Sequence, residues 1–244
     1  MLSAFRTPWT DVAAHLAEVS PVMMLPFGAL EAHGPHLPLG TDTIVAEEVA
    51  RRLADEFDAV LLPPIHYGDT WGTAGYPGTM SLSSDTVAAI VVDLGRAARS
   101  AGARLFVIVN GDWGNRAPIA DAVARLADVD GLVSVVLDYP GMDAAIEEVR
   151  EAPTAAPGLN HAEEAETSIL LDLEPGVVHR DRYVAEYPAF PADFGTRPLQ
   201  LHTFSPSGVF GDPSRATAEK GAHILEATVS ESVRTLRPLV DALG

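Results

Sequence analysis

Residue types suited to metal binding gather in the stretch LPFGALEAHGPHLPLGTDT (25–43). Glu31, His33, His36 and Asp42 lie within twelve residues of one another. Carboxylates with an imidazole suit Mn, Fe, Zn or Mg, and Glu31 and His33, two positions apart, point to the same side of an extended chain. The stretch therefore predicts a metal site. Each residue also has an ordinary interpretation: Asp42 as a helix N-cap, the histidines as loop residues and Glu31 as a solvated charge.

The elements around this stretch predict how it is positioned. The apolar run VMMLPF (22–27) is typical of a buried strand, and a helix is expected over about 43–57. Open α/β sheets bind ligands outside the carboxyl ends of their strands. Two further expected strands, 59–65 and 104–111, also run into polar or glycine-rich loops. We expect the three loops to converge on one site.

The rest of the chain alternates strands and helices, which predicts a single α/β domain (1–244) with a parallel sheet. A fourth strand is expected over 131–139, and a Pro/Ala/Gly linker over 152–160. Residues 66–82 are expected to be an ordered lid or pocket wall, since they carry Trp71 and Tyr76. The other expected helices are 9–18 (capped by Thr10 or Asp11), about 84–101 (capped by Ser84 and Asp85), 118–129, 142–152, one that starts after His161, and a last one that ends near 239.

Composition limits the classes of partner. The formal charge of the 244-residue chain is −18, which argues against nucleic acid or an anionic membrane as partner and favours cations. There is no cysteine, so any metal must be held by His, Asp and Glu. The N-terminus has no signal-peptide pattern and no apolar run approaches the roughly 20 residues of a membrane span, so we expect a cytoplasmic protein.

A second acidic segment, HAEEAETS (161–168), begins at His161. Glu163, Glu164 and Glu166 fall in the first turns of the expected helix. Glutamates are favoured there by the helix macrodipole, so any of them can be a purely structural charge.

Together these motifs resemble the creatininase family of metal-dependent amidohydrolases, and most closely its peptidase-like members associated with mycofactocin maturation. The resemblance rests on 28–42, YPGTMSL (76–82), NGDWGN (110–115), HAEEAETS and, in support, 205–217. It implies a three-layer α/β/α sandwich, a two-metal site, hydrolysis of an amide and a homo-oligomer, commonly a hexamer. By the resemblance, Glu31, His33 and Asp42 match metal ligands with Asp42 bridging, Glu166 completes the second metal, and His161 lies near the substrate.

Two departures from the family pattern matter. The family usually has NGHGGN where this chain has NGDWGN, so Asp112 replaces a histidine ligand and Trp113 a glycine. Gly72 and Thr73 stand where Glu-His is frequent. Asp112 remains a good ligand for hard cations, and with it four carboxylates balance two divalent ions, which favours Mn, Fe or Mg over Zn. The alternative is that Asp112 does not reach a metal and the site holds one ion or none.

The expected reaction is hydrolysis of a C–N bond in a small, biosynthetic substrate by metal-activated water. His161 is the candidate for proton transfer or for holding the oxyanion, and Glu164 a weaker one. Trp71, Tyr76, Trp113 and His36 are the expected substrate-binding residues. Two alternatives stay open: another reaction on the same site (lactone hydrolysis, deformylation or dehydration), and a non-catalytic binding subunit.

Overall fold

A parallel sheet of five strands forms the middle layer of the fold in a computed structural model that describes residues 1–156 and 158–243. Its order is β1-β3-β2-β4-β5. The strands are β1 (Leu2–Ser3), β2 (Val22–Phe27), β3 (Val60–Leu61), β4 (Leu105–Asn110) and β5 (Val133–Leu137). Pro157, in the expected 152–160 linker, and Gly244 lie outside the described residues. The α/β class, the parallel sheet and the four expected strands are confirmed.

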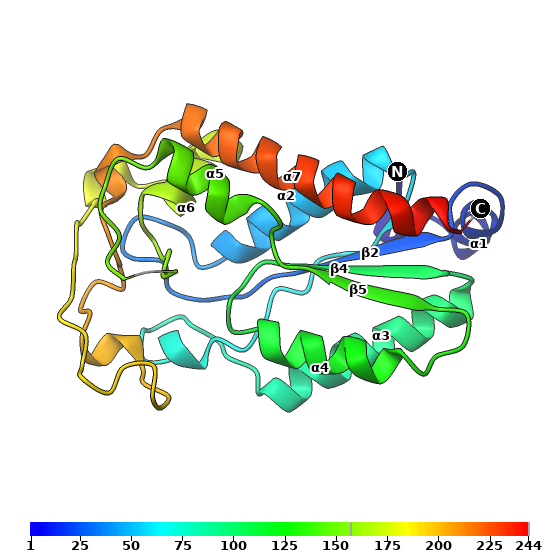
Figure 1. The fold of residues 1–244 in the computed structure, drawn as a ribbon, viewed down its shortest axis with the longest axis horizontal. Helices are drawn as coiled ribbons and strands as arrows, with labels where there is room; N and C mark the ends of the chain where they lie inside the picture. The colour runs from blue at the N-terminus through cyan, green and yellow to red at the C-terminus, as the bar shows by residue number, and fades with distance from the viewer. Residues whose placement is uncertain (157, 244) are drawn as a thin grey trace.

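Helices cover both faces of the sheet (Figure 1). On one face lie α2 (Thr41–Glu56), α5 (Met142–Val149), α6 (Glu164–Leu173) and α7 (Ala218–Asp241), and on the other α1 (Trp9–Glu18), α3 (Ser84–Ala101) and α4 (Arg116–Leu126). The side-chain alternation of β2 explains the two layers: Met24 packs in the first apolar cluster, whereas Met23 and Leu25 pack in the second. All six residues of β2 are buried, because a strand with helices on both faces meets apolar atoms on both sides.

The sheet differs from expectation at one edge. β1 was not expected, because two residues carry no periodicity; it pairs in parallel with β3, with Leu2 opposite Val60. β3 is shorter than the expected 59–65 strand, but Ile65 still forms a bridge to Phe27. The loop that follows β3 is therefore delivered next to the loop that follows β2.

The N-caps observed at the helix starts differ from several of the expected ones. α1 has Pro8 at its N-cap, with no capping side chain, rather than Thr10 or Asp11. α3 is capped by Ser83, whose side chain accepts from the N–H of Thr86. α2 starts at Thr41 after Gly40, again without a side-chain cap. Asp42 is therefore not an N-cap, and its carboxylate is free for another role.

Long irregular segments gather beyond the carboxyl ends of the strands, at the left of Figure 1. They contain the short 3₁₀ helices Trp71–Thr73, Pro175–Val177, Arg180–Arg182, Leu201–Thr203 and Pro213–Arg215; another, Ala4–Arg6, lies near the N-terminus. The Tyr76 hydroxyl donates to the backbone oxygen of Ser205 at 2.6 Å, which joins two of these segments. In the described part of the chain, no helix is both long and apolar enough to cross a membrane.

Candidate functional site

The loops after β2, β3 and β4 meet, as the sequence predicted. The N–H of Gly28 donates to Ile65, and that of Gly111 to Phe27. The Asn115 side chain links all three loops: its amide donates to the Gly28 oxygen at 3.0 Å and its oxygen accepts from the N–H of Asp69 at 2.8 Å. Gly114 is needed here because a Cβ would lie 1.9 Å from the backbone oxygen of Asp69.

The five residues expected to bind metal come together at this junction. Their ligand atoms form three overlapping groups, in each of which all atoms lie within 4.8 Å of one another. The groups are Glu31, His33 and His161; His33, Asp42 and Glu166; and Glu31, Asp42 and Asp112. Asp42, at the start of α2, belongs to two of these groups. Asp112, which follows β4, lies in the cluster with Glu31 and Asp42. Their roles as ligands stay a prediction, but their positions fit it.

His33 lies at the centre of the cluster and is almost completely buried. Its Nε2 is 3.2 Å from Asp42 Oδ1, 3.7 Å from Glu166 Oε2 and 3.8 Å from Glu31 Oε1. Its Nδ1 lies 3.2 Å from the Glu31 backbone oxygen; since that oxygen only accepts, Nδ1 carries the proton and Nε2 faces the carboxylates. Such a fixed tautomer is typical of a metal-binding histidine.

Two buried side-chain atoms in the cluster have no hydrogen-bond partner in the described chain: His33 Nε2 and Asp42 Oδ2. Buried polar atoms are almost always paired. Once its proton is displaced, this nitrogen and a carboxylate oxygen that faces further carboxylates are the donor set that a divalent cation requires. The residues therefore fit a metal site by their own chemistry.

Neighbouring groups hold the carboxylates in place. The Thr73 hydroxyl donates to Glu31 Oε2 at 2.5 Å, and the N–H of Asn115 donates to Asp112 Oδ2 at 3.2 Å. The N–H of Ala162 donates to Glu166 Oε2 at 2.6 Å. Thr73 thus has a function at the position where the family pattern often has a histidine: it orients Glu31.

Without a cation, the carboxylates destabilise one another. Burial, followed by the charges of Asp112 and Asp42, raises the pKa of Glu31 well above its usual range. Burial, followed by Asp42, raises the pKa of Asp112 to about 8 and that of Glu166 to about 7. Burial alone lowers the pKa of His33, but the carboxylates, Asp42 foremost, outweigh it and raise that pKa well above its usual range. Protons therefore occupy this site when no metal neutralises it.

His161 lies beside the cluster as a neutral imidazole. Its Nε2 is 2.9 Å from the backbone oxygen of Ala32 and must donate to it, so Nδ1 holds a lone pair, 4.0 Å from Glu31 Oε1. Burial, with the charge of His33 second, lowers the pKa of His161 to about 3. Its ring is 4.5 Å from that of His33. This position fits the expected role of His161 as a proton acceptor. It would also allow His161 to bind a metal together with Glu31 and His33, a role that the sequence did not suggest.

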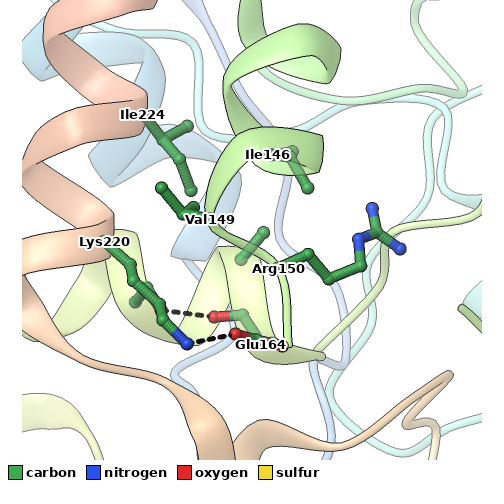
Figure 2. Close-up of a pocket in the computed structure, with 8 residues that line it drawn as sticks. Ile146, Val149, Arg150, Glu164, Lys220 and Ile224 are labelled. Carbon is green, nitrogen blue, oxygen red and sulfur yellow. Dashed lines mark hydrogen bonds and ion pairs between the residues drawn. The ribbon is translucent and has the colours of Figure 1, made fainter. Parts of the chain in front are cut away.

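The structure corrects the expectation for Glu164, whose carboxylate points away from the cluster. Figure 2 shows it beside Lys220 between α5 and α7. Its oxygens accept from Lys220 Nζ at 2.5 Å, from the N–H of Ala152 at 2.7 Å and from that of Glu151 at 3.1 Å. Glu164 therefore joins helices in an ion pair and has no position for proton transfer. Glu163, similarly, caps α6 through the N–H groups of Ala165 and Glu166.

The expected substrate-binding residues divide into one buried residue and three at the surface. His36 has no exposed surface and lies 2.9 Å from the Thr167 hydroxyl through Nε2, so it supports the loop internally rather than contacting a substrate. Trp113 is 72% exposed and Trp71 47%. Tyr76 is half-buried against Ser205. These three can line the rim of the site but form no closed wall in the single chain.

Tyr139, just after β5, was not anticipated. Its hydroxyl is buried without a hydrogen-bond partner among the described residues. Burial, followed by the charge of Asp42 and of further carboxylates, raises its pKa well above the usual range. The sequence offered one indication: Tyr139 lies at the end of an expected strand, and the neighbouring strand β4 ends next to Asp112. The sequence pattern around Tyr139 is otherwise that of a turn.

Several known proteins are similar to this chain in fold and in sequence. The Creatininase family model, described as creatinine amidohydrolase, matches residues 6–236. A mycofactocin precursor peptide peptidase of Mycolicibacterium smegmatis is 34% identical over 230 residues, which cover 91% of this chain and 86% of that protein. A creatinine amidohydrolase of Pseudomonas putida is 30% identical over 243 residues, 94% of each. A solved structure named Creatininase Mn has a TM-score of 0.87 at 28% identity, with 98% of both chains covered. The chain belongs to the creatininase family of amidohydrolases.

Proposed function

We propose that the chain is a metal-dependent hydrolase that cleaves an amide or peptide-type C–N bond of a small, biosynthetic substrate. The observation that carries the proposal is the pair of buried, unpartnered atoms, His33 Nε2 and Asp42 Oδ2, which face three further carboxylates. A folded protein maintains such a costly arrangement where a cation compensates it. The names of the relatives with 34% and 30% identity, a peptide peptidase and a creatinine amidohydrolase, support the type of bond.

Glu31, Asp42 and Asp112 would hold one divalent cation, and His33, Asp42 and Glu166 would hold a second. The oxygen-rich set favours Mn or Fe over Zn, whereas the names of two equally similar solved relatives include Mn in one case and Zn in the other. When bound, the metal polarises the scissile carbonyl and lowers the pKa of a water molecule to about 7.

The chain's own groups then control protons and orientation. His161 presents its Nδ1 lone pair 4.0 Å from Glu31 Oε1, and we assign it the transfer of a proton from the attacking water to the leaving nitrogen. The donation of its Nε2–H to Ala32 fixes the ring so that the acceptor keeps its direction. Thr73 and Asn115 hold the Glu31 and Asp112 carboxylates, which limits their movement when the charge in the site changes.

The decisive experiment measures metal and hydrolysis on the same preparations. Wild type and Asp112→Ala are purified without added metal and assayed for metal per chain, then for release of product from creatinine and from short peptides, with and without a chelator. About two ions in the wild type, fewer in the variant, and chelator-sensitive hydrolysis would support the proposal. A wild type that binds no metal, even after soaking, would refute it in favour of a binding protein.

A second candidate is a different reaction on the same metal site, such as lactone hydrolysis, deformylation or dehydration. The observation that favours it is the substitution of Asp112, Trp113 and Thr73 at positions around the cluster. A protein that holds metal but cleaves no amide in the assay above would support this candidate.

The single domain over 1–244, the homo-oligomer and the cytoplasmic location are part of the same proposal. The large exposed side chains Phe5 and Trp9, 77% and 80% exposed, offer apolar area that an oligomer would cover. Size-exclusion chromatography with light scattering measures the assembly, and a monomer at micromolar concentration would contradict it.

A further inference from the structure

Tyr139 has a backbone conformation that large side chains seldom take. Its φ is 46°, in the left-handed region, and the other non-glycine residues of the described chain with positive φ are Asp58 and Ala162. Ala162 is itself at the site, where its N–H donates to Glu166. Strained backbone of this kind clusters where a side chain or an N–H must be aimed at a ligand.

The ring of Tyr139 packs against apolar side chains, and its hydroxyl is buried. Its ring packs against the apolar cluster that contains Leu137 and Ile146. Its hydroxyl is buried and has no partner in the described chain, and the carboxylates that act on it are those of Asp42, Asp138, Glu166 and Asp112. The same apolar cluster contains Val45 and Ala165, from the helices that carry Asp42 and Glu166, which places Tyr139 on the β5 side of the metal-candidate cluster.

Several other donors at the site are already used. The Thr73 hydroxyl donates to Glu31, the Asn110 amide to Asp112 O and to Asp138, and His161 Nε2 to Ala32. The cluster itself offers acceptors, because its members are carboxylates and an imidazole lone pair. A carbonyl oxygen that enters the site needs a donor, and Tyr139 is a donor that these contacts leave free.

We propose that Tyr139 contacts the substrate and that its O–H donates a hydrogen bond to the carbonyl oxygen of the scissile bond. The proposal rests on the hydrolase function proposed above and adds a residue to it. A neutral O–H whose acceptor gains negative charge during attack stabilises the transition state more than the ground state.

The test compares Tyr139→Phe with a matched control, Tyr183→Phe. Tyr183 also has a buried hydroxyl without a partner, but its ring lies against His36, at 5.1 Å between centroids, and carboxylates of the cluster do not act on it. Both substitutions remove an unpartnered hydroxyl and keep the ring, so both variants should fold and melt like the wild type.

The probe is acetohydroxamate, which carries a carbonyl oxygen and binds divalent metals, titrated by calorimetry into manganese-loaded protein. We expect Tyr139→Phe to weaken binding about 5- to 10-fold with metal per chain unchanged, and Tyr183→Phe to bind like the wild type. Equal affinity in Tyr139→Phe and wild type, or an equal loss in both variants, would overturn the assignment of Tyr139 while the hydrolase proposal stands. A wild type without metal would overturn both.

Discussion

Asp112→Asn separates the cost of burying a carboxylate from its use in binding metal. The pKa of Asp112 is about 8 in the metal-free protein, against roughly 3.9 in an unfolded chain. Between these values the folded state holds a proton that the unfolded state has lost, so the stability of the metal-free protein falls as pH rises until pH passes the folded pKa. Asparagine removes this dependence and keeps nearly the same shape.

The size of the effect follows from the pH interval. From pH 6 to the folded pKa of about 8 there are two units, each worth about 1.4 kcal/mol. The stability advantage of Asp112→Asn over wild type should therefore grow by about 3 kcal/mol between pH 6 and pH 9. For a chain of this size that corresponds to roughly 6–12 °C in melting temperature.

The assay is thermal unfolding in excess chelator at pH 6 and pH 9, with Asp128→Asn as the control. Asp128 is exposed, and its substitution should shift the melting temperature equally at both pH values. A gap between Asp112→Asn and wild type that does not widen with pH would refute the conclusion that the Asp112 carboxyl is buried among like charges. After manganese is added, the order should reverse, since the wild type gains stability from a ligand that the variant binds less well.

Three further predictions concern the cluster and the helices around it. Trp113→Gly removes a side chain that is 72% exposed, so it should change the free energy of unfolding by less than about 1 kcal/mol. It should, however, alter the KM for a series of amides of increasing size. Unchanged rates for every substrate would show that Trp113 does not line the substrate site. Glu164→Gln should cost about 1.5–3 kcal/mol in urea unfolding, because Lys220 loses its buried partner and keeps the exposed Glu151. The kcat of the folded enzyme should stay unchanged, and a loss of kcat at full stability would restore a catalytic role for Glu164. Thr73→Val frees the carboxylate of Glu31 and should weaken metal binding about 10-fold, measured by competition with a chelator, and equal affinity would show that the hydroxyl does not orient this ligand.

Local patterns were sufficient for most of the fold. The strand over Val22–Phe27 and the helix over Trp9–Glu18 have the predicted bounds, because a buried run and a continuous period each depend on consecutive residues. Caps and edges were predicted less well: Ser83 rather than Ser84 caps α3, and β1 was not anticipated. A cap depends on one backbone angle, and a two-residue edge strand depends on a partner that is distant in sequence.

The sequence by itself indicated which loops meet, because strand ends of a parallel sheet share one edge, and its resemblance to the creatininase family added Asp112 and Glu166 to the candidates Glu31, His33 and Asp42. Only the tertiary structure decided which carboxylates face the cluster. Glu164 and Glu166 lie two positions apart at the start of one helix, yet Glu166 faces His33 at 3.7 Å and Glu164 faces Lys220. On a helix, two positions turn a side chain by about 200°, and which side is the site depends on α5, α7 and the β2 loop that pack around it. The same packing buries the Tyr139 hydroxyl without a partner among the described residues, and no local pattern around Tyr139 predicts that burial.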